Sequence, residues 1–257
     1  MDSGFYSSFS GFAARMDALD LVANNLANAN TTGYKAHHEF YRSLAAALSS
    51  QPSLIPAGTL PQVINTSINQ FGVLGGSRLD LAQGTLETTG NDTDVALEGS
   101  GYLAVLTKNG VRYTRDGNFS LDKNRNLVTK EGDFVLSAQP NQSNKPIQIP
   151  SGQITISPDG TLSVDGSVLS KLRIEDFAPG AQLTPEGNTY LIASADTTPA
   201  AASATVRQGM LESSNSDPVR ASIALIDLQR TAQMMERALS IFNNDFNRTA
   251  AQDIPRV

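Results

Sequence analysis

The sequence lacks several residue types on which common classes of function depend. It contains no cysteine, which excludes disulfides, thiolate metal sites and cysteine nucleophiles. It contains no tryptophan and only 10 Phe and 6 Tyr in 257 residues, so we do not expect a deep aromatic ligand cage. Its net charge of −6 argues against binding of duplex nucleic acid, which usually requires a clustered basic face. No stretch reaches the ~18 consecutive apolar residues of a membrane-spanning helix.

The N-terminus lacks the features of a secretory signal peptide. Met1-Asp2-Ser3-Gly4-Phe5 contains no basic region and leads into no unbroken apolar run. A place outside the cytoplasm would therefore require another export route. Charge is spread unevenly, since residues 51–206 hold ten basic and fifteen acidic side chains, a net of −5. Two nearly neutral ends thus flank an acidic centre.

Each end of the chain carries apolar residues at alternating steps of three and four, the seven-residue repeat of helices that pack side by side. The N-terminal row is Phe5, Phe9, Phe12, Met16, Leu19, Ala23 and Leu26. The C-terminal row is Leu225, Leu228, Ala232, Met235, Leu239, Phe242 and Phe246. One such row alone is typical of any amphipathic helix. Its presence at both ends, with a different pattern between them, favours pairing of two terminal helices.

Local signals indicate where these helices end and begin. The cluster of Asn28, Asn30 and Gly33 favours a C-terminal cap and turn after the first helix. Ser216-Asp217-Pro218 predicts the start of the last helix, with a capping residue followed by proline in the first turn. Because a long helix is marginal in water unless its apolar face is packed, each terminal helix needs a partner.

The centre of the chain has the pattern of a β-domain. Short β-rich runs alternate with turn signals such as Asn109-Gly110, Asp116-Gly117, Glu131-Gly132 and Asp165-Gly166, which supply the positive φ angles of tight turns. Eight or more strands spaced about ten residues apart predict an antiparallel sandwich or barrel-like domain. The predicted runs are 95–97, 102–106, 111–114, 118–121, 127–129, 134–136, 154–156 and 162–164.

The sequence therefore predicts an α+β protein, with N- and C-terminal helices paired as a coiled coil and a central all-β antiparallel domain. We expect residues 1–44 to form the N-terminal helix and its cap, and 207–257 the C-terminal helix, of one domain. The central β-domain is expected at 81–206. Residues 45–80, which mix Ala, Ser, Pro and Gly with Gln and Asn, are expected to form an extended linker. Residues 194–204 are similar in composition and are expected to lead back to the last helix.

Motifs for enzyme chemistry are weak. Gly99-Ser100-Gly101 begins a match to the dinucleotide-binding fingerprint, but the chain continues as a predicted strand rather than opening a helix. His37 and His38 are the only histidines, and no nucleophile elbow is present.

Carboxylates offer no better case. The neighbouring carboxylates Glu175 and Asp176, and Asp92 and Asp94, are of a kind that is usually solvated. Two runs that begin like calcium loops, from Asp116 and Asp122, place leucine where such a loop requires glycine. We expect no enzyme activity, no cofactor and no metal.

Three blocks of sequence resemble those of bacterial flagellar rod and hook axial proteins. Residues 21–35, which end in Thr32-Gly33-Tyr34-Lys35, resemble the N-terminal block of that family. Residues 94–102 and 113–119 resemble its middle, and residues 208–215 with Leu228-Gln229-Arg230 resemble its C-terminal block. The blocks span nearly the whole chain in the expected order, and the absence of a larger middle insertion resembles the short rod proteins rather than a hook subunit.

The resemblance implies a structural axial subunit of the flagellar basal-body rod, in the periplasm. In that family the terminal helices pack as a coiled coil into an inner tube, with the β-domain outside it. The implied partners are further copies of the chain, other rod and hook axial proteins and surrounding ring proteins. The implied export route is the flagellar type III apparatus, and neither nucleic-acid binding nor membrane insertion is implied.

The position of the subunit along the rod and one alternative function stay open at this point. Met1-Asp2 and residues 216–219 resemble the proximal rod protein, which we favour, whereas Leu228-Gln229-Arg230 resembles the distal one and residues 253–257 differ from both. A secreted module that binds glycan or peptidoglycan is the alternative. That alternative requires an exposed aromatic platform, for which Tyr102, Tyr113 and Phe119 are the clustered candidates, although we expect them to pack in the core.

The predicted assembly interface combines the two apolar rows with three asparagines near the end of the first helix. These asparagines either hydrogen-bond between helices and fix their register or cap the helix locally. The interface residues are Phe5, Phe9, Phe12, Met16, Leu19, Asn24, Asn25, Leu26, Asn28, Leu225, Leu228, Met235, Leu239, Phe242 and Phe246.

Overall fold

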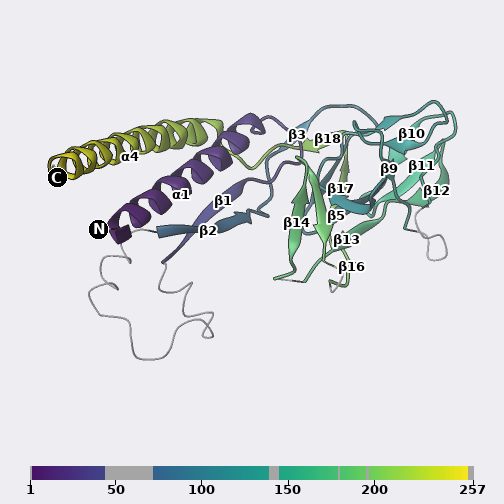
Figure 1. The fold of residues 1–257 in the computed structure, drawn as a ribbon. Coiled ribbons are helices and arrows are strands. Elements are labelled where there is room, and N and C mark those ends of the chain that lie inside the picture. Colours follow the sequence, from purple (N-terminus) through teal and green to yellow (C-terminus); the bar gives the residue numbers. More distant parts are fainter. Residues whose placement is uncertain (1, 44–71, 139–144, 179, 195–196, 254–257) are drawn as a thin grey trace. The chain divides into compact units, whose positions relative to one another are not determined.

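A computed structural model describes residues 2–43, 72–138, 145–178, 180–194 and 197–253 of the chain (Figure 1). These residues divide into two units. The helical unit contains the described residues 2–27, 37–43, 72–80 and 217–253. The β unit contains residues 28–36 and the described residues between 81 and 216. The chain is α+β, as the sequence predicts.

The helical unit contains two long helices and a hairpin. Helix α1 spans Asp2–Ala27 and helix α4 spans Pro218–Asp253. Strands β1 (His37–Ser43) and β2 (Gly72–Leu79) pair antiparallel, with a register shift between Phe40 and Tyr41. Helix α1 contacts α4 and also both strands of the hairpin (Figure 1). No described helix is long and apolar enough to cross a membrane.

The predicted C-terminal end of α1 and the predicted start of α4 are confirmed. Helix α1 ends at Ala27, directly before Asn28. Helix α4 begins at Pro218, whose fixed φ suits the first helical position. The Oδ1 atom of Asp217 accepts hydrogen bonds from the backbone N–H groups of Val219, at 2.9 Å, and Arg220, at 3.2 Å. Asp217 therefore caps the helix by satisfying amides that have no partner within its first turn.

The β unit is built from short antiparallel strands. Its largest sheet has the order β14-β15-β6-β5-β9-β8-β7, to which β13 and β16 are joined through β5. Strands β10, β11 and β12 form a second sheet, and the pairs β17–β4 and β18–β3 bring the end of the unit back to its beginning. The bounds are β3 Leu86–Thr88, β4 Val95–Glu98, β5 Tyr102–Thr107, β6 Gly110–Thr114, β7 Ser120–Leu121, β8 Leu127–Val128, β9 Phe134–Val135, β10 Ile154–Ile156, β11 Thr161–Val164, β12 Ser167–Lys171, β13 Ile174–Asp176, β14 Leu183–Glu186, β15 Tyr190–Ala193, β16 Ala200–Ala201, β17 Thr205–Gln208 and β18 Met210–Glu212.

Side chains from strands far apart in the sequence form the hydrophobic core of the β unit. Leu97, Leu103 and Leu162, from β4, β5 and β11, are completely buried. Phe119 and Val206 pack in the same cluster. Removal of this apolar surface from water is the main favourable contribution to the stability of the unit.

All eight predicted runs contain strands, and the turn signals act as predicted at the hairpin between β11 and β12. Asp165 and Gly166 both have positive φ angles, of 48° and 80°, as the central residues of a type I′ turn require. None of the predicted runs lies after residue 166, where the structure has the strands β12 to β18.

The structure differs from the expected elements in five places. Residues 37–43, expected with the first helix, form strand β1, and residues 200–201, expected in the connection to the last helix, form strand β16. Residues 28–36, expected with the first helix, belong to the β unit. Residues 72–79, expected as linker, form strand β2, because backbone pairing with β1 does not depend on apolar alternation. Residues 207–212, expected with the last helix, lie in β17 and β18, where Leu211 is buried. Residues 45–71 of the expected linker lie outside the described residues.

Leu162 provides a test of the core. Leu162→Ala should lower the free energy of unfolding of the β unit by about 2–5 kcal/mol, because the side chain is fully buried and the core relaxes only in part around the cavity that its removal leaves. Leu81→Ala is the matched control. Because Leu81 is 45% exposed, this substitution should lower the free energy of unfolding by less than about 1 kcal/mol. Urea denaturation measures both, and equal losses would contradict the described core.

Candidate functional site

The predicted row on α4 corresponds to the better buried side of that helix. Leu228 and Ala232 are buried, at 8% and 7% exposure, and Leu225, Met235 and Leu239 are half-buried. The side chains of Phe242 and Phe246 lie outside the described residues. Within the helical unit α4 has α1 as its neighbour.

The predicted row on α1 is less buried than a second row on the same helix. Phe12, Leu19 and Leu26 are half-buried and Met16 is 40% exposed. Gly11, Ala14, Ala18 and Asn25, also at helical spacing, are buried. Small side chains let neighbouring backbones approach closely. The predicted row was selected by its large apolar residues and therefore missed this buried side of α1. The side chains of Phe5 and Phe9 lie outside the described residues.

The three asparagines make different contacts. Asn25 pairs with the backbone of His37, since its Nδ2 donates to the His37 carbonyl at 2.7 Å and its Oδ1 accepts from the His37 N–H at 2.9 Å. This pairing fixes the end of α1 to the start of β1. Asn28 is buried in the β unit, where its carbonyl oxygen accepts from the N–H of Thr31 at 3.0 Å. Asn24 is exposed. Local roles for Asn25 and Asn28 therefore exist, and a role in assembly stays a prediction.

The aromatic residues considered as a glycan platform are buried. Tyr102, Tyr113 and Phe119 are 5%, 7% and 2% exposed. Tyr113 packs edge-on against Phe177, with ring centroids 4.8 Å apart. Burial, together with the nearby Glu175, raises the pKa of Tyr113 to about 12. These three side chains serve the core of the β unit and form no binding platform.

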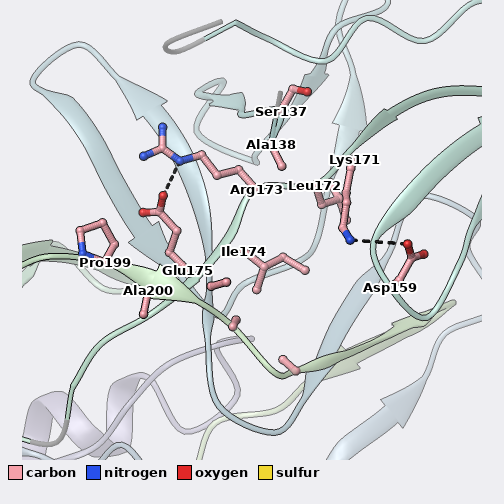
Figure 2. Close-up of a pocket in the computed structure, with 13 residues that line it drawn as sticks. Ser137, Ala138, Asp159, Lys171, Leu172, Arg173, Ile174, Glu175, Pro199 and Ala200 are labelled. Atoms are coloured by element: carbon pink, nitrogen blue, oxygen red, sulfur yellow. Dashed lines mark hydrogen bonds and ion pairs between the residues drawn. The ribbon is translucent and has the colours of Figure 1, made fainter. Parts of the chain in front are cut away.

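A pocket of about 640 Å³ in the β unit brings together charged side chains that already pair with one another (Figure 2). Arg173 Nε lies 2.6 Å from Glu175 Oε1, and Lys171 Nζ lies 3.5 Å from Asp159 Oδ2. The neighbouring carboxylate of Asp176 accepts a hydrogen bond from the N–H of Phe177. Paired in this way, these groups do not have the arrangement of an acid and a base flanking a substrate.

The other motifs also have structural roles. The chain after Gly101 continues as strand β5, so it does not form the helix of a dinucleotide site. Asp122 Oδ1 accepts hydrogen bonds from the N–H groups of Asn124 and Asn126 and so closes a turn. Asp94 accepts from the Thr89 hydroxyl at 2.6 Å. Among the described residues no group of His, Asp and Glu side chains suits a metal ion.

The three sequence blocks meet at one buried carboxylate in the β unit. Glu212, from β18, has a fully buried side chain whose Oε1 atom lies 2.5 Å from Lys35 Nζ. Its Oε2 atom lies 3.2 Å from Arg115 Nη1, and Oε1 also accepts from the N–H of Gly84. Lys35 comes from the first block, Arg115 from the middle block and Glu212 from the last. We call these three residues the ion cluster.

The cations of the ion cluster are held by further contacts. Lys35 Nζ donates to the Ala82 carbonyl at 2.7 Å, and Arg115 Nη2 donates to the Gly99 carbonyl at 2.7 Å. The Arg115 guanidinium lies over the ring of Tyr102, 5.1 Å from its centroid. Such contacts offset part of the cost of removing two cations and one anion from water.

Gly33 brings the first block against the middle one. Its φ of 68° is in the left-handed region, and a Cβ atom there would lie 2.2 Å from the backbone nitrogen of Asp116. Its N–H donates to the Glu212 carbonyl at 2.7 Å. Next to it, the Thr32 hydroxyl donates to Asp116 Oδ1 at 2.8 Å. Only glycine fits this close backbone approach.

Asn215 ties together the points at which the chain enters and leaves the β unit. Its Oδ1 atom accepts from the N–H of Ala36 at 2.7 Å, and its Nδ2 donates to the Ala82 carbonyl at 3.2 Å. Residues 36, 82 and 215 lie next to the unit boundaries at 36/37, 80/81 and 216/217. Three connections of the β unit therefore leave it at one place.

Sequence reasoning identified the blocks but not their convergence. Nothing in the spacing of Lys35, Arg115 and Glu212, which are separated by 80 and 97 residues, indicates that they meet. The sequence offered one indirect indication of the ion cluster: its lysine, arginine and glutamate each lie within a different one of the three blocks that resemble the rod and hook family.

Comparisons with known proteins agree with the order of the blocks. Residues 5–35 match the flagella basal body rod protein family, and residues 96–164 match the D1 domain of the flagellar hook protein FlgE/F/G. The flagellar basal-body rod protein FlgF of Caulobacter vibrioides is 32% identical over 94% of this chain and 95% of its own length. FlgF of Mesorhizobium japonicum is 29% identical over 93% and 95% of the two chains. FlgG of Borreliella burgdorferi is 28% identical over 95% and 96%.

These matches and the α+β fold define a bacterial flagellar axial protein. Within that class, the chain belongs to the flagellar basal-body rod protein family. It is a structural subunit of the basal-body rod and not an enzyme. Membership in the family indicates assembly with other basal-body components.

Removing the anion of the ion cluster tests its role. Glu212→Gln leaves Lys35 and Arg115 buried without their counter-charge, and should lower the free energy of unfolding of the β unit by about 3–5 kcal/mol. Glu98→Gln is the matched control. Because Glu98 pairs with Arg207 at the surface, this substitution should lower the free energy of unfolding by at most about 1 kcal/mol. Chemical denaturation measures both. A loss for Glu212→Gln no larger than the control would contradict the described cluster.

Asp116 provides a test based on pH. Burial raises the pKa of Asp116 above its ordinary value of 3.8, despite the hydrogen bond from Thr32. Above that raised pKa the charged carboxylate destabilises the folded state. As the pH falls through the raised pKa, the folded state takes up a proton at a higher pH than the unfolded state does. Relative to Asp116→Asn, the wild type should therefore gain stability as the pH falls from 7 toward 4.

Asp122 is the control for this measurement. Hydrogen bonds from Asn126 lower the pKa of Asp122, so the wild type should lose stability relative to Asp122→Asn as the pH falls below 4. Urea midpoints across the pH series report both differences. A constant difference for Asp116→Asn would show that its carboxyl is not perturbed.

Proposed function

We propose that the helical unit is the part of this rod subunit that polymerises. In this proposal α1 and α4 pair as a coiled coil and, with those of neighbouring copies, form the wall of a helical tube, with the β unit outside it. The observation that carries the proposal is the contact between two terminal helices that each have a seven-residue apolar repeat. An open helical array requires heterologous contacts, in which one face of a subunit meets a different face of the next.

The proposal extends to the specific partners of the subunit, its export route and its position along the rod. We propose that the subunit contacts other rod and hook axial proteins and surrounding ring proteins, and that the flagellar type III apparatus exports it without a cleaved signal peptide. We favour the proximal part of the rod on the resemblance of residues 216–219. The distal part is the second candidate, on the resemblance of Leu228-Gln229-Arg230.

Leu228 provides the test, because it is the best-buried leucine of the predicted row on α4. A tagged Leu228→Asp chain should be absent from isolated basal bodies, since a carboxylate on this face opposes packing against α1. Tagged Val168→Asp, at a residue of the β unit that is 72% exposed, should be incorporated like the wild type. Gold labelling and immunoblotting report incorporation, and the wild-type label reports the position along the rod.

Two controls make the result decisive. The unfolding transition of the β unit should be unchanged in Leu228→Asp, which shows that the variant is folded outside the helical unit. Normal incorporation of Leu228→Asp would overturn the proposal that paired terminal helices form the tube. A label at the distal end would overturn the proximal assignment and leave the assembly mechanism standing.

A further inference from the structure

Helix α4 has a second apolar row on the side away from the predicted one. Its members are 50–66% exposed, although all are large and apolar, and they are Val219, Ile223, Ile226, Met234 and Ile241. Two exposed arginines, Arg230 and Arg237, complete the row at the same helical spacing. We call these seven residues the outer row.

The outer row runs almost straight along the helix. Its steps of 4, 3, 4, 4, 3 and 4 from residue 219 to 241 average close to the 3.6 residues of a helical turn. At a rise of 1.5 Å per residue, 22 residues cover about 33 Å. The predicted row with Leu228 and Ala232 lies on the opposite side. An exposed apolar row of this length suits a second helix rather than a small molecule.

The exposed side of α1 has the complementary character. Ala13, Met16, Asp17 and Asp20 are exposed on it. Met16 is a large apolar residue, Ala13 is small enough for close approach, and the two aspartates are the exposed charged side chains of α1 from residue 11 onward. The helix α1 therefore offers an acidic, partly apolar face where the outer row of α4 offers apolar side chains and two arginines.

Resting on the proposed function, we propose that the outer row of α4 binds the exposed face of α1 from a second copy of the chain. Arg230 and Arg237 then lie near Asp17 and Asp20 of that copy, and Met16 packs among the apolar side chains of the row. Two outer rows packed together would instead bring arginines toward arginines, which is unfavourable. Because the two faces differ, each subunit can bind one neighbour on each side, and the array stays open.

Cysteine cross-linking tests this contact directly, because the chain contains no cysteine. Full-length Met16→Cys is mixed with full-length Met234→Cys or Ile226→Cys, at a concentration where light scattering shows assembly, and is then oxidised. We expect a disulfide-linked dimer of the two different variants in at least one mixture, in excess of the dimers that each variant forms alone. Val168→Cys, in the β unit, gives the background of random collisions.

A dimer yield at the Val168→Cys background in both mixtures would overturn the proposal. So would a predominance of dimers between two copies of the same variant, because the contact would then be symmetric. If Leu228→Asp is nevertheless excluded from basal bodies, only this inference fails and the proposed function stands. If Leu228→Asp is incorporated normally, the proposed function fails whatever the cross-links show.

Charge reversal tests the orientation of the contact. Arg230→Glu with Arg237→Glu should weaken assembly about fivefold or more, because each exposed ion pair contributes up to about 1 kcal/mol. Adding Asp17→Arg and Asp20→Arg in the same chain should restore assembly and the original net charge. Lys108→Glu with Lys123→Glu, both exposed in the β unit, controls for net charge. Failure of the fourfold variant to recover would contradict the pairing of these charges.

Discussion

A single buried carboxylate, that of Glu212, is the constraint on which the rest of the β unit depends. A carboxylate without access to water is tolerated only when cations and hydrogen-bond donors surround it. Here the donors come from Lys35, Arg115 and the N–H of Gly84, so three other stretches of chain must reach Glu212 before its charge is satisfied. Packing of the leucine-rich core stabilises the unit, whereas the ion cluster determines which segments close it.

The consequence concerns the stretch that follows the first helix. Residues 28–36 could serve as a flexible connection, yet they are tied to the β unit by Gly33, Lys35 and Ala36. Because Asn215 binds the backbone of Ala36 and Ala82, the connections that lead toward both terminal helices start from one anchored place.

Features set by neighbouring residues were predictable from the sequence, and features set by distant ones were not. The cap at Asp217, the turn at Asp165-Gly166 and the core strands follow from local chemistry and alternation. The strand β2 was not predicted, because backbone pairing with β1 leaves no apolar pattern in its glycine-rich sequence. Burial of Ala14 and Ala18 on α1 was missed because small residues give a weak hydrophobic signal. The ion cluster depends on contacts across 177 residues that only the fold reveals.

Hydrogen exchange at the amide of Gly33 tests most directly whether residues 28–36 are an integral part of the β unit. This N–H donates to the Glu212 carbonyl, and the N–H of Leu136 donates to the Ala104 carbonyl in the core. Amides that open only with global unfolding share one free energy of exchange. We predict the same exchange free energy for Gly33 and Leu136 in the full-length chain. Exchange of Gly33 at the rate of an unfolded peptide, with Leu136 still protected, would contradict this account.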